Sequence, residues 1–136
     1  MAESHLELIE RLYGAFNRRD ADGIVAICDE GMEFFPFETA GAVGREAPYV
    51  GPDGLGEYLA DVATVWEELL VTPSKVEQIG DQLLVRGRVY VRSREHGIRD
   101  MPAAWIWGVH EGRFVRGEVF PNPSAAEERF SQLTLV

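Results

Sequence analysis

Short turns divide the second half of the chain into four extended segments, and this feature constrains the fold most strongly. The residues GDQ, EHG and EG separate segments 74–79, 83–93, 98–110 and 113–120, which are rich in valine, isoleucine and aromatic residues. Turns of this length join neighbouring antiparallel strands. The sequence therefore predicts an antiparallel meander over residues 74–120.

The first half of the chain has the apolar spacing of helices. Apolar residues recur every three or four positions over 4–17, with Ser4 as the expected N-cap, and over 53–70, which follows Pro52. We expect three further elements: a short helix at 24–28, a strand at 32–37 and a last helix at 122–130. Residues 38–51 are expected to form a loop.

Helices segregated from a curved antiparallel sheet make an α+β fold. In such a fold the sheet wraps around the long helix and leaves a cone with an open mouth. The inner face of the sheet is then the wall of a pocket.

Charge and composition disfavour several classes of partner. The 136 residues carry a net charge of −10, so nucleic acid and anionic membrane surfaces are poor partners. No apolar run reaches the roughly 18 residues of a membrane span. The histidines at 5, 96 and 110 lack metal-ligand spacing, so we expect neither a metal nor a cofactor. The single cysteine, Cys28, is typical of a protein in the reducing cytoplasm.

Three segments carry a family resemblance. They are LYGAFNRRDADGIVAICDEGMEFFP near the start, YVGPDGLGEYL at the start of the long helix and GRFVRGEVFPNPSAA near the end. In this order and spacing, the chain resembles the SnoaL-like branch of the NTF2-like superfamily, which is related to polyketide cyclases and ketosteroid isomerases. The resemblance covers about residues 6–130 and implies one cone-shaped domain over residues 1–136, expected as a homodimer. This fold hosts isomerases, cyclases, epoxide hydrolases, dehydratases and proteins that only bind ligands.

The resemblance also shows that the acid and base positions of these enzymes are apolar in this chain. Leu12 aligns with a tyrosine of the isomerases, Phe35 with their general base and Trp105 with their proton-donating aspartate. Val119 stands where the cyclases and epoxide hydrolases carry an acid. If this register is right, the cavity is hydrophobic and aromatic.

Trp105 and Trp107 are the strongest sign of a pocket. They lie two residues apart on one strand, so they point to the same side, about 7 Å from each other. Each indole N–H needs a partner when it is buried, which suits a pocket wall better than a dry core. The other expected wall residues, each also compatible with a plain core position, are Leu12, Phe16, Phe35, Tyr58, Trp66, Tyr90 and Val119.

Glu33 and Arg88 are the candidate catalytic residues. A carboxylate half-buried among Met32, Phe34 and Phe35 would have a raised pKa, as a general base needs; the alternative is a solvated carboxylate at a strand edge. Arg88 lies on the same face of its strand, 83–93, as the other arginines of that strand, while valines occupy the opposite face. The pattern places the arginines outside.

Two other placements of the arginines stay open. Inside the cone, Arg88 would polarise an oxygen of the ligand. At a dimer interface, the arginines would pair with Glu118.

The sequence therefore predicts a protein that binds a hydrophobic small molecule in its cone. One form of this hypothesis is a cofactor-independent cyclase, isomerase or dehydratase of secondary metabolism. Another is a non-catalytic carrier. A third is a partner-binding domain whose own aromatic residues fill the cone.

Overall fold

One curved sheet organises the described part of the chain, which a computed structural model gives for residues 5–36, 39, 42–95, 97–120 and 122–134. The elements before the long strands are α1 (His5–Asn17), α2 (Ala21–Val25), β1 (Cys28–Pro36), β2 (Tyr49–Val50) and α4 (Gly51–Val65). The remaining elements are β3 (Glu68–Ile79), β4 (Gln82–Ser93), β5 (Gly97–His110), β6 (Arg113–Phe120) and α5 (Pro123–Thr134). The expected Ser4 cap lies outside the described residues.

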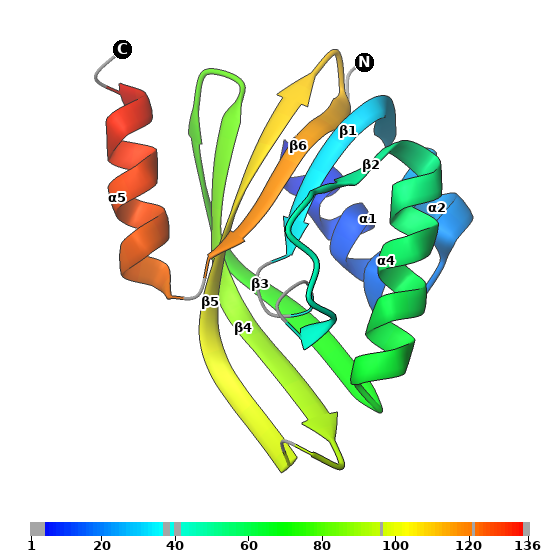
Figure 1. The fold of residues 1–136 in the computed structure, drawn as a ribbon. Coiled ribbons are helices and arrows are strands. Elements are labelled where there is room, and N and C mark those ends of the chain that lie inside the picture. Colours follow the sequence, from blue (N-terminus) through cyan, green and yellow to red (C-terminus); the bar gives the residue numbers. More distant parts are fainter. Residues whose placement is uncertain (1–4, 37–38, 40–41, 96, 121, 135–136) are drawn as a thin grey trace.

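The described strands form one sheet in the order β2-β1-β6-β5-β4-β3. Strands β3 to β6 are the predicted antiparallel meander. Helices α1, α2 and α4 lie on one side of this sheet and α5 lies on the other (Figure 1). The predicted α+β cone is thus confirmed. One pair of strands is not antiparallel as expected, because β1 runs parallel to β6.

Two predicted boundaries are wrong. The long helix ends at Val65 instead of residue 70, and Leu69 belongs to β3. Its spacing fits a helix, but the β-branched Val71 and Thr72 favour the strand that pairs with β4. Cys28, expected at the end of a short helix, begins β1 and pairs with β6.

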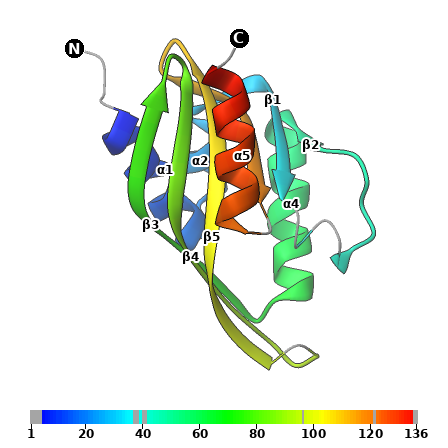
Figure 2. The same ribbon diagram turned by 90° about the vertical axis from the view of Figure 1, so that its left-hand side faces the viewer.

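The two faces of the sheet carry different side chains. In β4, Leu83, Val85 and Val91 are buried toward the helices α1 and α4, whereas Arg86 and Arg88 lie on the other face. The predicted division between valines and arginines is therefore confirmed. On that outer face α5 covers part of the strands (Figure 2), and a small cluster packs beneath it: Leu84, Ala104, Ile106, Ala126 and Phe130.

Within the described ranges, every helix is too short or too polar to cross a bilayer.

Gly117 makes room for an indole. It pairs with Trp107 across β5 and β6, and a Cβ atom at this position would overlap with the Cζ3 and Cε3 atoms of that ring. The indole also stacks on Phe34, with ring centroids 5.6 Å apart and planes at 8°. The absence of a side chain at Gly117 is thus a packing requirement of Trp107.

We expect Gly117→Ala to lower the free energy of unfolding by about 1–3 kcal/mol, which is the usual cost of overpacking a filled core. Urea unfolding followed by tryptophan fluorescence measures this change. Gly56→Ala is the matched control, because Gly56 is exposed on α4 and an added Cβ there meets no atom within 4 Å. The control should stabilise the helix by up to about 1 kcal/mol. A Gly117→Ala protein as stable as the wild type would contradict this packing.

Candidate functional site

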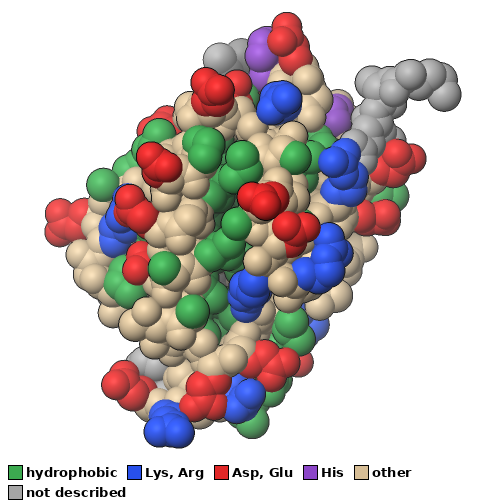
Figure 3. Space-filling view, turned by 90° about the vertical axis from the view of Figure 1, so that its right-hand side faces the viewer, with side chains coloured by type: hydrophobic (Ala, Val, Ile, Leu, Met, Phe, Trp, Pro, Cys, Tyr) green, Lys and Arg blue, Asp and Glu red, His purple; other side chains and the backbone are tan. Residues whose placement is uncertain are grey.

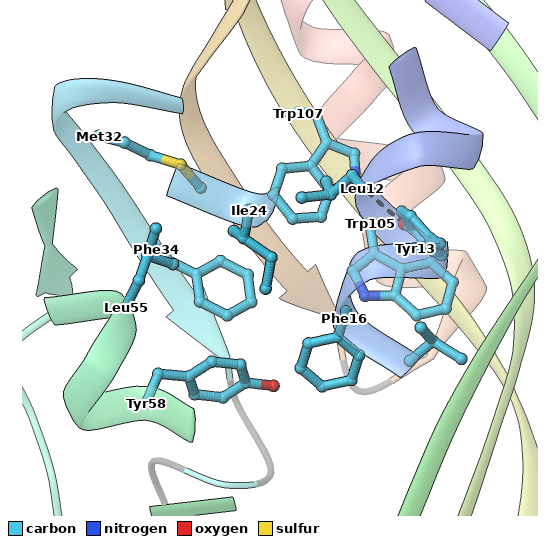
Figure 4. Close-up of a pocket in the computed structure, with 11 residues that line it drawn as sticks. Leu12, Tyr13, Phe16, Ile24, Met32, Phe34, Leu55, Tyr58, Trp105 and Trp107 are labelled. Atoms are coloured by element: carbon cyan, nitrogen blue, oxygen red, sulfur yellow. Dashed lines mark hydrogen bonds between the residues drawn. The ribbon is translucent and has the colours of Figure 1, made fainter. Parts of the chain in front are cut away.

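An aromatic cavity of about 50 Å³ lies between the helices and the inner face of the sheet. On the face of the molecule that carries α2 and α4, hydrophobic side chains are visible in a hollow (Figure 3). Figure 4 shows how the side chains of the first cavity converge from helices and strands. They are Leu12, Tyr13, Phe16, Ile24, Met32, Phe34, Leu55, Tyr58, Val71, Trp105 and Trp107.

A second cavity of about 60 Å³ adjoins the first. Its walls are Pro36, Thr39, Tyr58, Leu69, Val71, Val89, Met101, Pro102, Ala103, Trp105, Val119 and Phe120. Tyr58, Val71 and Trp105 line both cavities, so these three side chains form a partition between them. Each cavity is far below the 300–1,000 Å³ or so of typical ligand pockets. A ligand of ordinary size would not fit within either cavity alone.

Trp107 is fixed in place by its neighbours. Its indole N–H donates to the Tyr13 hydroxyl at 3.0 Å. The ring of Tyr13 meets Trp105 and Trp107 edge-on, with centroids at 5.1 and 6.2 Å. Burial raises the pKa of Tyr13 well above its usual value, although the hydrogen bond from Trp107 acts the other way. Tyr13 therefore stays a neutral acceptor, and Trp107 is a satisfied, rigid wall of the cavity.

Trp105 differs from Trp107 in its polar edge. Among the described residues no group accepts a hydrogen bond from its indole N–H. Every fully enclosed side-chain nitrogen and oxygen in the described part has a partner, so this N–H meets the open space of the cavity. The nitrogen edge of Trp105 is turned into the pocket (Figure 4).

Tyr58 brings a second polar group to the partition. Its hydroxyl also points into the pocket in Figure 4, and its ring stacks on Phe16 at 5.7 Å and 21°. Burial raises the pKa of Tyr58 above its usual range, although the positive charge of Arg19 acts the other way. The Thr39 oxygen accepts the indole N–H of Trp66 at 3.2 Å. Tyr58 is thus a neutral phenol whose hydroxyl faces the pocket.

The structure brings together six of the nine predicted wall residues. Leu12, Phe16, Tyr58, Trp105 and Trp107 line the first cavity, and Trp105, Tyr58 and Val119 line the second. Trp66 is buried at the end of α4 but borders neither cavity; it contacts the site through Thr39.

The predicted inward position of Phe35 on β1 is wrong, because its side chain lies on the outer face of the sheet. Phe34 pairs with Gly117 and Phe35 with Glu118, so Phe34 lies inward. Phe35 lies on the outer face, where the Arg116 guanidinium is 4.6 Å from its ring centroid. Glu33 shares that face, as expected, but it is exposed and does not line either cavity. The expected half-buried general base is therefore absent from this position.

Arg88 and Tyr90 are also outside the cavities, on the outer face of β4. Nε of Arg88 binds Oδ1 of Asp100 at 2.9 Å, and more than half of each side chain is exposed. Arg86 binds Glu77 and Glu127, the latter on α5. The alternative that placed Arg88 inside the cone is therefore wrong, because its side chain lies on the outer face of β4.

Most residues that line the two cavities were not predicted as wall residues, and Tyr13, Phe34 and Thr39 are the ones that contact the tryptophans. Tyr13 and Phe34 are aromatic neighbours of predicted positions, and their register alone decided whether they face inward. Thr39 lies in the segment expected to be a loop, and no periodic pattern indicates its inward position.

Ionisable side chains are scarce at the site. None of the described residues that line the two cavities carries a carboxylate, an imidazole or an amine. Across the described ranges, no three histidine, cysteine, aspartate or glutamate side chains gather to hold a metal ion. His96, one of the three histidines considered from sequence, lies outside the described residues. The polar groups of the site are hydroxyl and indole N–H groups.

The comparison with protein families decides the relationship. The sequence model of the SnoaL-like domain matches residues 9–117, most of the chain. The chain belongs to the SnoaL-like domain family. No curated protein matches it.

Solved structures show the same architecture. TerC, co-crystallised with polyporic acid, is 27% identical with a TM-score of 0.77, and the match covers 90% of this chain and 95% of TerC. An NTF2-like protein of Burkholderia pseudomallei is 21% identical, with a TM-score of 0.77 and coverages of 91% and 94%. A protein of ketosteroid isomerase-like fold from Catenulispora acidiphila, in complex with trimethylamine, is 12% identical, with a TM-score of 0.73 and coverages of 90% and 91%. The last two support the fold alone.

The buried tyrosines predict a loss of stability at alkaline pH. Their pKa values are raised in the folded protein and return to about 10 on unfolding, so above that pH the unfolded chain binds fewer protons. The stabilisation is complete below pH 10 and is lost as the pH rises further. We expect Tyr13 and Tyr58 to ionise together with unfolding.

Parallel pH titrations of tyrosinate absorbance and circular dichroism test this expectation. The Tyr13→Phe, Tyr58→Phe double variant should show a weaker dependence of stability on pH above 10. Ionisation of every tyrosine near pH 10 with the fold intact would contradict the expected burial.

Proposed function

We propose that the protein binds a planar, mostly hydrophobic small molecule in the aromatic space on the inner face of the sheet. The observation that carries this proposal is the partition: Tyr58 and Trp105 border both cavities and turn a hydroxyl and an N–H inward. Ligand pockets combine apolar walls with a few polar groups in this way. The family supports the same proposal, because it includes polyketide cyclase-type proteins and TerC was crystallised with polyporic acid.

Binding is better supported than acid–base catalysis. Neither Glu33 nor Arg88 reaches the cavities, and the described walls carry no carboxylate. A cyclase remains the second candidate, and the neutral hydroxyl of Tyr58 favours it. Such an enzyme would hold a flexible substrate in a reactive conformation and donate a hydrogen bond to a developing oxyanion.

The size of the cavities sets a condition for binding. An engineered cavity that binds benzene has a volume of about 150 Å³, and the two cavities here measure about 50 and 60 Å³. Displacement of the Tyr58 or Trp105 side chain would join them into one larger site. The proposal therefore includes a rearrangement of the partition on binding.

Two other parts of the proposal come from the sequence. One is a cytoplasmic location, and the other is a homodimer formed through the outer face of the sheet. In the described part, α5 already covers a portion of that face, so a second copy would contact the strands beside α5.

We expect polyporic acid to bind with a saturable change in tryptophan fluorescence and a measurable heat in isothermal titration calorimetry. Trp105→Phe removes the N–H and part of the wall and should weaken binding about tenfold, equivalent to ~1.4 kcal/mol. The controls are Glu33→Gln and Arg88→Gln, which change exposed groups on the outer face and should bind like the wild type.

The same titration separates the alternatives. If neither polyporic acid nor any compound of a panel of polycyclic and isoprenoid molecules binds, the cone is packed shut by its own aromatic residues. The protein would then be a partner-binding domain and the proposed function would be wrong.

A further inference from the structure

We propose that Arg19 binds an anionic group at the edge of the site, so that the site selects ligands whose ring system carries a carboxylate or another acidic group. This inference rests on the proposed function and identifies the charge of its ligand. It follows from the contacts of Arg19 with the walls of both cavities, from its lack of an acidic partner among the described residues and from its backbone conformation.

Arg19 joins the walls of the two cavities. Its Nη1 atom donates to the carbonyl of Phe16, which lines the first cavity, and its Nη2 atom donates to the carbonyl of Leu69, which lines the second; both distances are 2.6 Å. The guanidinium also lies 4.6 Å from the centroid of the Phe16 ring. A guanidinium has five N–H groups, so these two bonds leave further donors for a ligand. Arg19 is exposed, and a ligand at the edge of the site can reach them.

The charge of Arg19 also acts on the interior of the site. It lowers the pKa of Tyr58, whose hydroxyl faces the pocket, against the larger effect of burial. Desolvation is in turn the main reason why the pKa of Arg19 is lowered from its usual value. An arginine stays protonated at neutral pH all the same. Arg19 is therefore a partly desolvated cation beside the pocket, and an anion bound next to it would replace interactions that the guanidinium has lost with water.

No acidic side chain of the described residues pairs with Arg19. The chain has 23 aspartate and glutamate residues against 13 lysines and arginines, so acidic partners are abundant. Arg45 binds Glu57 at 2.9 Å, and the adjacent Arg18 lies 4.0 Å from Asp20. Within the described ranges, by contrast, the hydrogen bonds of Arg19 go to carbonyl groups alone. Its positive charge is thus available to a ligand.

The backbone of Arg19 adopts a conformation that favours glycine. Its φ angle is 57°, and it follows α1 in a Schellman motif, in which the N–H of Arg19 binds the Phe16 carbonyl and the N–H of Asp20 binds the Ala15 carbonyl, both at 2.9 Å. Glycine is usual at this position because the left-handed region disfavours a Cβ atom. Such conformations concentrate at functional sites. An arginine here therefore points to a role for its side chain, since the turn alone would favour glycine.

The experiment uses two ligands of one shape, 2-naphthoate and 2-naphthamide, which differ in charge. Isothermal titration calorimetry near neutral pH and at constant ionic strength measures their dissociation constants with the wild type and the variants. We expect the wild type to prefer 2-naphthoate about tenfold, and Arg19→Gln to abolish most of this preference by weakening the carboxylate only. Arg19→Lys keeps the charge but loses the planar fork of donors, so it should retain part of the preference.

Two further variants separate the role of this guanidinium from effects of net charge and of folding. Arg18→Gln removes the same charge one residue away, on a side chain that lines neither cavity, and should leave the preference unaltered. Arg19→Gly suits the positive φ angle, so it preserves the end of α1 while it removes the guanidinium. It should bind both ligands as Arg19→Gln does.

Three results would overturn this inference and leave the proposed function standing. They are equal affinity of the wild type for the two ligands, an Arg19→Gly protein that keeps the preference, and an equal loss of preference in Arg18→Gln and Arg19→Gln. If neither naphthalene nor polyporic acid binds, the proposed function fails and this inference fails with it.

Discussion

The packing of the Trp107 indole holds together four elements that surround the cavity. Its N–H bonds to Tyr13 on α1, its face stacks on Phe34 of β1, and it lies over Gly117 of β6 from its own position on β5. This one side chain therefore sets how the first helix and the parallel strand β1 sit on the meander.

The neighbouring indole has the opposite character. Trp105 occupies the same face of the same strand and contacts the same tyrosine ring, yet its N–H is left for the cavity. The two tryptophans cannot be distinguished in the sequence, but in the structure Trp107 is a packing residue and Trp105 faces the open space of the cavity. The difference arises from the single hydroxyl of Tyr13, which reaches one N–H and not the other.

The sequence predicts the parts of the fold whose hydrophobic pattern has a single solution. In β4 valines and arginines alternate, so the sequence predicts which side chains lie on the inner face and which on the outer face. The inward positions of Trp105 and Val119, which pair across β5 and β6, were predicted as well. In β1 the run MEFFPF has apolar residues at both odd and even positions, so the pattern could not decide whether Phe34 or Phe35 faces inward. The choice is made by the parallel pairing with β6, a contact across some 80 positions of sequence. Thr39 could not be predicted at all, since its role depends on the position of Trp66, which is 27 residues away in the sequence.

The partition between the two cavities has a kinetic consequence. In the proposed binding mode, a ligand that spans both cavities binds only when the side chains of the partition have turned aside, so its apparent affinity is reduced to the extent that the open form is rare. If opening is slow, the observed association rate levels off at high ligand concentration and becomes the same for different ligands. The aromatic ring that separates the cavities would then set a common rate of entry, whatever the chemistry of the guest.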